Sequence, residues 1–70
     1  MKRGIYRHYK GNLYEVMEVA THSESGEKLV VYRALYGDYG VWVRPQEMFA
    51  ETVEKDGARL PRFELLQPFD

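Results

Sequence analysis

The side chains best suited to chemistry lie in residues 32–45, which hold four aromatic rings, two arginines and an aspartate around a loop bracketed by glycines. Aromatic faces can stack on bases, grip proline-rich peptides or hold cations, and guanidinium groups add planar, bidentate contacts. Loops commonly lie at the protein surface. We therefore predict a contact surface formed by Tyr36, Asp38, Tyr39, Trp42, Arg33 and Arg44.

A purely structural interpretation of the same residues stays open at this point. Tyr32 and Trp42 are large enough to fill the core of a small domain. Asp38 follows Gly37, where a carboxylate commonly accepts hydrogen bonds from nearby backbone N–H groups. Arg33 and Arg44 could pair with Asp38 or Glu47 and brace the loop.

Other reactive side chains do not form a recognisable catalytic or metal site. His8 and His22 lie on different segments without helical zinc-site spacing, and the chain has no cysteine. Ser23 and Ser25 lie in a turn beside His22, which offers neither a positioned base nor an oxyanion pocket. No glycine-rich phosphate-binding motif is present. We expect no catalytic residue, no metal, no cofactor and no enzymatic activity.

Length and composition limit the organisation of the chain. Seventy residues with 44% hydrophobic and 14% aromatic content predict a single domain over residues 1–70. The net charge of −1 disfavours binding to nucleic acid through overall charge, although a local basic patch remains compatible with it. The charged N-terminus is not followed by an apolar run, and the lack of cysteine suits a reducing compartment, so we expect a cytoplasmic protein that does not contact membranes.

Turn signals at short intervals predict an antiparallel all-β fold. They separate segments rich in Val, Tyr, Leu and Phe, and no helix-period stretch of useful length appears. In residues 13–21 the alternation slips near Met17 and Glu18, which predicts a bulge or bend. Pro45 opens one helical turn, whose Met48 and Phe49 are expected to fill the core. Five or six strands with this turn fit a small SH3-like barrel, and an OB-like barrel is the less favoured alternative.

The last third of the chain is expected to form a hairpin. Residues 51–54 and 59–66 would pair around a turn at Asp56 and Gly57, with Pro61 marking an edge or a bulge. Residues 67–70 are expected to be loosely held.

The ordered motifs of the chain resemble those of the DUF1653 family. The resemblance rests on residues 4–11 (GIYRHYKG), 14–16 (YEV), 22–24 (HSE), 31–38 (VYRALYGD) and 42–45 (WVRP), followed by Met48 and Phe49. It covers nearly the whole chain through about Phe63. The resemblance implies a bacterial, stand-alone SH3-like β-barrel with no assigned function, and it therefore implies no catalytic residue.

These observations lead to one main functional hypothesis and two alternatives. The main hypothesis is a binding module that contacts a peptide or protein segment through the aromatic and arginine loop face. The first alternative is binding of single-stranded RNA, with tyrosines stacking on bases and arginines or Lys10 reaching phosphates. The second alternative is a homodimer formed by pairing of edge strands.

Overall fold

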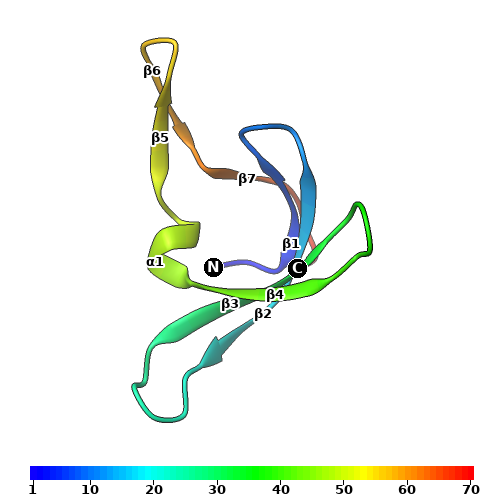
Figure 1. Cartoon of the computed structure of the whole chain (residues 1–70), viewed down its shortest axis with the longest axis vertical. Helices are drawn as coiled ribbons and strands as arrows, with labels where there is room; N and C mark the ends of the chain where they lie inside the picture. Colours follow the sequence, from blue (N-terminus) through cyan, green and yellow to red (C-terminus); the bar gives the residue numbers. More distant parts are fainter.

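The structure, a computed structural model, describes all 70 residues as seven strands and one helical turn (Figure 1). Five strands form one antiparallel sheet in the order β4-β3-β2-β1-β7, and the remaining two form a separate hairpin. The elements are β1 (Gly4–His8), β2 (Leu13–Thr21), β3 (Lys28–Ala34), β4 (Val41–Pro45), α1 (Gln46–Phe49), β5 (Thr52–Lys55), β6 (Ala58–Pro61) and β7 (Phe63–Pro68).

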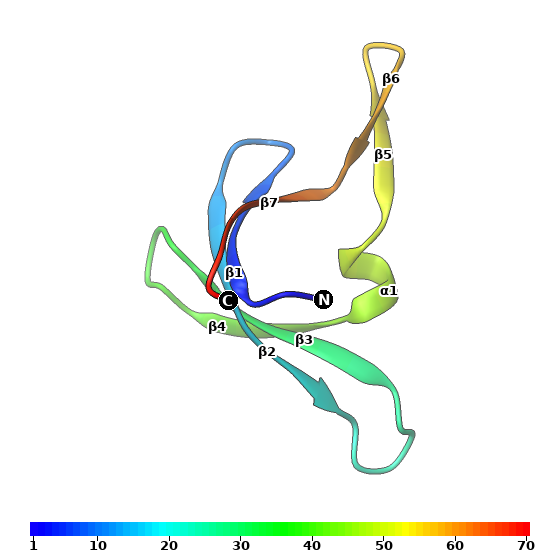
Figure 2. The same ribbon diagram turned by 180° about the vertical axis from the view of Figure 1, so that it is seen from behind.

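The five-stranded sheet curls around an interior without closing on itself. Its edge strands, β4 and β7, do not pair with each other. Figures 1 and 2 show α1 and the start of β5 lying between the ends of these strands, on the open side of the curl. The prediction of a small all-β fold with one helical turn is confirmed. The expected number of five or six strands is wrong, because the chain bends at Arg62 and divides the predicted last strand into β6 and β7.

The predicted irregularity in β2 is present. The pairing of β2 with β3 shifts register between Val16 and Glu18, so that Val16 lies opposite Tyr32 whereas Val19 lies opposite Val30. A bulge adds one residue to one strand and increases the local twist. Because of this shift, Val16 and Val19 can both face the interior although they are three residues apart.

The core is small and largely aromatic. Phe49 is 1% exposed, and its ring stacks on Phe63 at 3.9 Å and meets Tyr6 edge-on at 5.7 Å. Met48, by contrast, is 48% exposed. The expectation that Met48 fills the core is wrong, because neighbouring residues of a helix point about 100° apart and only one of them can face the same interior. The buried cluster consists of Tyr6, Val16, Val30, Tyr32, Phe49 and Phe63.

The two ends of the chain are paired. Gly4 lies opposite Pro68 in the β1–β7 ladder, and the Phe69 N–H donates a hydrogen bond of 3.0 Å to the Arg3 carbonyl. The expectation of a loosely held tail is therefore wrong. The β5–β6 turn at Asp56 and Gly57 is as predicted, with φ angles of 52° and 79°.

Candidate functional site

The pairing of β3 with β4 divides the predicted contact residues between two faces of the sheet. Tyr32 lies opposite Trp42, and Val30 lies opposite Arg44. Since directly opposed residues point to the same face, Trp42 and Arg44 share the face of the buried residues Tyr32 and Val30. We call this concave surface the inner face. Arg33, being adjacent to Tyr32 along the strand, belongs to the opposite face.

The loop between β3 and β4 is held mainly by backbone groups. The Ala34 N–H donates to the Gly40 carbonyl at 3.0 Å, and the Tyr39 N–H donates to the Tyr36 carbonyl at 3.1 Å. The Arg33 guanidinium donates to the Tyr39 carbonyl at 2.8 Å. Arg33 therefore does brace the loop, but through a carbonyl oxygen. Neither Arg33 nor Arg44 forms an ion pair within the chain, and the exposed Asp38 carboxylate accepts no hydrogen bond.

Three of the four aromatic residues in this region are open to solvent. Trp42 is 61% exposed, Tyr39 is 54% exposed and Tyr36 is 44% exposed, whereas Tyr32 is only 8% exposed. Tyr32 thus belongs to the core, as the structural interpretation held. Trp42 does not, because β4 is an edge strand and the interior ends before its inner side is covered. The indole Nε1 lies close to Gly40, where a Cβ atom would approach it to 3.2 Å.

Tyr14 links the exposed rings to the core. Its ring lies 5.6 Å from Tyr32, 5.6 Å from Tyr36 and 5.5 Å from Phe63. The hydroxyl groups of Tyr14 and Tyr36 are 2.8 Å apart and share a hydrogen bond. Burial, together with this hydrogen bond, raises the pKa of Tyr14 to about 12. The Tyr14 hydroxyl is therefore neutral at physiological pH, and its hydrogen bond fixes Tyr36 at the margin of the inner face.

His8 lies at the other side of this aromatic row. Its ring centroid is 4.9 Å from that of Phe63 and 4.6 Å from that of Tyr9. Its Nδ1 accepts a hydrogen bond of 3.2 Å from the Lys10 backbone N–H, which places the proton of a neutral ring on Nε2. Burial lowers the pKa of His8, and the positive charges of Arg62, Lys10 and Arg44 lower it further. His8 is therefore biased toward the neutral form.

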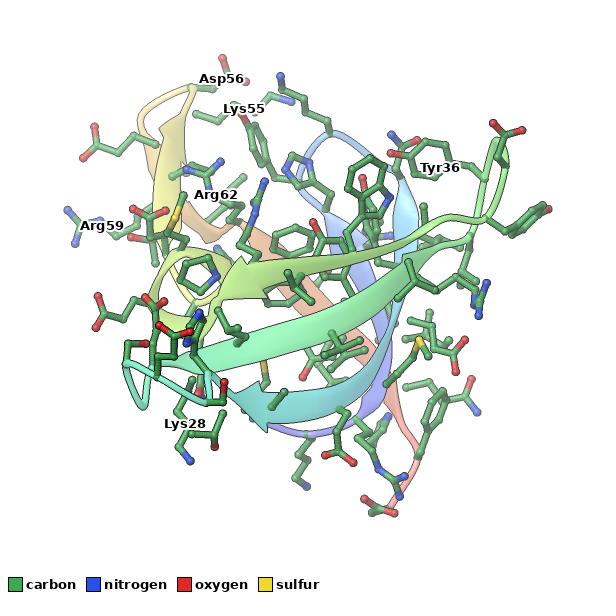
Figure 3. All side chains as sticks on the ribbon, turned by 60° about the horizontal axis from the view of Figure 1, so that its bottom comes forward. Lys28, Tyr36, Lys55, Asp56, Arg59 and Arg62 are labelled. Carbon is green, nitrogen blue, oxygen red and sulfur yellow. The ribbon has the colours of Figure 1, made fainter.

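The arginines on this side of the molecule are poorly matched by carboxylates. The Arg44 guanidinium lies 5.8 Å from the Phe63 ring centroid. The Arg62 Nη2 is 3.7 Å from the Glu51 Oε1, and its buried Nε atom has no hydrogen-bond partner. Figure 3 shows Arg62 and Tyr36 on the same side of β4, toward its opposite ends. The inner face thus combines open aromatic rings with cations that have unused donors.

No enclosed pocket or metal-ligand cluster lies within this surface. One hollow of about 210 Å³ is lined by Arg7, Tyr9, Leu60, Pro61 and Glu64. A second, of about 510 Å³, is lined by Glu27, Lys28, Pro45, Gln46, Glu47 and Ala50. No group of three or more His, Cys, Asp or Glu side chains could hold a metal ion. None of the helical residues forms a segment of the length and apolar character needed to cross a membrane. The candidate site is therefore an open face.

Comparison with known proteins gives a family. Residues 4–65 match the family described as "Protein of unknown function (DUF1653)". The chain belongs to the DUF1653 family. A crystal structure of a DUF1653 protein from Bordetella bronchiseptica is similar over 100% of this chain and 92% of that one, with 33% sequence identity and a TM-score of 0.88. No curated protein matches. The DUF1653 resemblance seen in the sequence motifs is thus confirmed, and it brings no assigned activity.

The sequence-based prediction found the loop residues of the site but not the residues across from them. Tyr14, His8 and Arg62 meet the inner face from β2, β1 and the β6–β7 junction. The alternation of Tyr6 and His8 in the sequence indicates that they share a face. The sequence does not show that this face meets Phe63. That contact follows from the pairing of β1 with β7, which places His8 opposite Phe63.

Proposed function

We propose that this DUF1653 protein is a non-catalytic binding module that docks an extended peptide segment of a partner protein along the free edge of β4. The observation that carries the proposal is the exposure of three consecutive apolar residues on an edge strand. Val41, Trp42 and Val43 are 48%, 61% and 61% exposed. Native proteins usually protect edge strands with charges, bulges or a covering element.

The backbone of β4 supports the same proposal. The hydrogen bond from the Ala34 N–H to the Gly40 carbonyl sets the phase of the β3–β4 ladder. In an antiparallel ladder, alternate residues direct their N–H and C=O groups toward the partner strand. Trp42 therefore bonds to β3, whereas the N–H and C=O groups of Val41 and Val43 point outward. An added strand would find two donors and two acceptors there.

Side chains on both faces of β4 would supply specificity. Strand addition derives affinity from main-chain hydrogen bonds and specificity from contacts with alternate side chains. Trp42 and Tyr36 would contact one set of peptide side chains on the inner face. Val41 and Val43 would contact the other set on the outer face, next to Arg33 and the exposed Tyr39. The six residues expected from the sequence would thus all lie within reach of one bound segment, with Asp38 at the loop tip.

The same free edge could pair with the β4 strand of a second copy, which is the homodimer alternative. Pairing centred on Trp42 would place Val41 of each copy opposite Val43 of the other and would satisfy all of their outward N–H and C=O groups. A peptide and a second copy would then compete for one edge. The oligomeric state distinguishes these occupants.

A proline at position 43 tests the proposal because it removes only an outward N–H group. Val43→Pro should leave the β3–β4 ladder intact, and Val43→Thr is the matched control that keeps the N–H group. We expect peptides selected from a displayed random library to bind the parent and Val43→Thr, and to lose affinity for Val43→Pro. Circular dichroism should show the same fold for all three proteins. Equal binding by Val43→Pro, or the absence of any selected peptide, would contradict the proposal. Light scattering that shows a dimer dissociated by Val43→Pro would assign the edge to a second copy.

A further inference from the structure

The cations around His8 have little counter-charge, in contrast to three of the other arginines. Arg3, Arg7 and Arg59 each pair with a carboxylate, at 3.1, 2.7 and 3.6 Å respectively. On the inner face Arg44 and Lys10 form no ion pair, and Arg62 pairs with Glu51 at 3.7 Å, about as loosely as Arg59 pairs with Glu54. The folded chain therefore concentrates positive charge in one place although its net charge is −1.

Lys10 completes this group from the β1–β2 turn. Its ammonium lies 5.8 Å from the Tyr9 ring centroid and forms no ion pair. The His8 ring is affected by three cations at once, because the positive charges of Arg62, Lys10 and Arg44 all disfavour its protonation. The Arg62 Nε is the one buried side-chain nitrogen or oxygen atom that lacks a hydrogen-bond partner. A ligand cannot reach this buried atom, but the Arg62 side chain as a whole is 29% exposed, so its terminal amino groups can meet an acceptor from a ligand.

Open aromatic rings adjoin these cations on the same face. Trp42 precedes Arg44 by two residues on β4, so their Cα atoms are about 6.8 Å apart and both side chains point inward. Tyr36 is held in place by the hydroxyl of Tyr14 and exposes 44% of its surface. A flat group on Trp42 would leave an attached anion within reach of Arg44.

We propose that the inner face binds single-stranded nucleic acid, with unpaired bases stacked on Trp42 and Tyr36 and the neighbouring phosphates held by Arg44, Arg62 and Lys10. Proteins that bind single strands combine a cationic track for the backbone with aromatic side chains for the bases. A duplex fits less well because its bases are already stacked and their faces are covered. The near-neutral net charge indicates that binding depends on this local group of cations.

This inference is independent of peptide docking at the β4 edge, because each binding mode requires groups that the other does not. A peptide strand requires the outward backbone of Val43, whereas a nucleic-acid strand requires the guanidinium groups of Arg44 and Arg62. Val43→Pro should therefore abolish only the former. Loss of the two arginines should abolish only the latter. Trp42 contributes to both and does not distinguish them.

The only tryptophan of the chain provides the assay. Titration of the full chain at low salt with a mixed-sequence RNA of about eight nucleotides should quench Trp42 fluorescence with saturation in the micromolar range. A matched duplex should bind more weakly, and a single mononucleotide should bind at least roughly tenfold more weakly, because it offers one base and one phosphate group. The logarithm of the affinity should fall with the logarithm of salt concentration with a slope of about −2 for three phosphate contacts.

Variants that each remove one positive charge distinguish binding at the proposed site from non-specific attraction by the overall charge of the protein. Arg44→Gln, Arg62→Gln and Lys10→Gln should each weaken binding by roughly fivefold or more and reduce the salt slope by about 0.7. Arg59→Gln is the control, because Arg59 lies on the β5–β6 hairpin and points away from β4 in Figure 3. Lys10 is exposed, so its variant keeps the test valid if Arg62→Gln proves unstable.

Several results would overturn the inference. Absence of quenching at micromolar RNA would do so, as would an equal loss of affinity in Arg59→Gln. Tight binding of the mononucleotide, equal to that of the strand, would reassign the face to a nucleotide ligand. Binding that Val43→Pro abolishes but Arg44→Gln and Lys10→Gln leave unchanged would place the strand on the β4 edge.

Discussion

Replacing Phe49 with alanine should remove a large part of the stability of this protein. Phe49 is 1% exposed and is the only buried residue of α1. Its ring stacks on Phe63 of β7 and contacts Tyr6 of β1 and Tyr32 of β3 edge-on. It therefore joins strands from both sides of a sheet that does not close. No other side chain of α1 can replace it.

The expected cost follows from the size of the cavity and of the domain. Phe→Ala substitutions in cores cost about 3–5 kcal/mol. A 70-residue domain has a total free energy of unfolding of about 4–10 kcal/mol. Phe49→Ala should thus lose roughly half of the stability. Met48→Ala, which changes the exposed neighbour in the same helical turn, should cost less than about 0.5 kcal/mol.

Urea denaturation followed by far-ultraviolet circular dichroism measures both variants. Phe49→Ala should lower the midpoint by more than about 1 M relative to Met48→Ala. Fluorescence is the weaker probe here because Trp42 is already 61% exposed in the folded state. Equal midpoints for the two variants would refute the reasoning that Phe49 joins the two sides of the sheet. A Phe49→Leu variant should fall between them, because it fills part of the same space.

Three further predictions concern close packing and titration. Gly4→Ala should destabilise the fold by about 1–3 kcal/mol, because its Cβ would collide with the β7 backbone; Gly40→Ala, which meets only a side chain, should cost less in the same urea assay. Tyr14 has a pKa of about 12 in the folded chain, so it ionises more readily in the unfolded chain. The parent should therefore lose stability between about pH 10 and pH 12. If a Tyr14→Phe variant loses stability equally over this range, ionisation of Tyr14 is not the cause. The pKa of His8 is lowered, so its contribution to stability is present above its ordinary pKa and is lost as the pH falls through the folded value. Unfolding free energies between about pH 7 and pH 5 should decline more for the parent than for His8→Asn, and parallel profiles would refute the assignment.

Local sequence signals predicted the elements and the solvent-facing loop. The slip of alternation near Met17, the Asp56 and Gly57 turn and the single helical turn after Pro45 are all present. Each of these three features depends on residues within a few positions of one another, so it can be recognised in the sequence without knowledge of the fold. The exposure of Tyr36 and Tyr39 follows in the same way from their positions beside Gly37 and between Gly37 and Gly40.

The composition of the inner face depended on pairings between distant residues. His8 meets Phe63 because β7 returns to pair with β1, and no local pattern specifies that partner. Likewise, the choice of Phe49 over Met48 for the core depends on the rotation of α1 relative to the sheet. Trp42 is exposed because β4 is an edge strand. Only the order of the strands in the sheet shows that β4 lies at the edge.

The pairing of β1 with β7 has a consequence during synthesis on the ribosome. Within this sheet, β1 leaves the exit tunnel before the other strands and gains its second neighbour only after β7 has followed it. Until then one side of β1 offers unpaired N–H and C=O groups to other nascent chains. Chains that terminate before Phe63 should therefore accumulate as insoluble aggregates, whereas chains that extend through Pro68 should not.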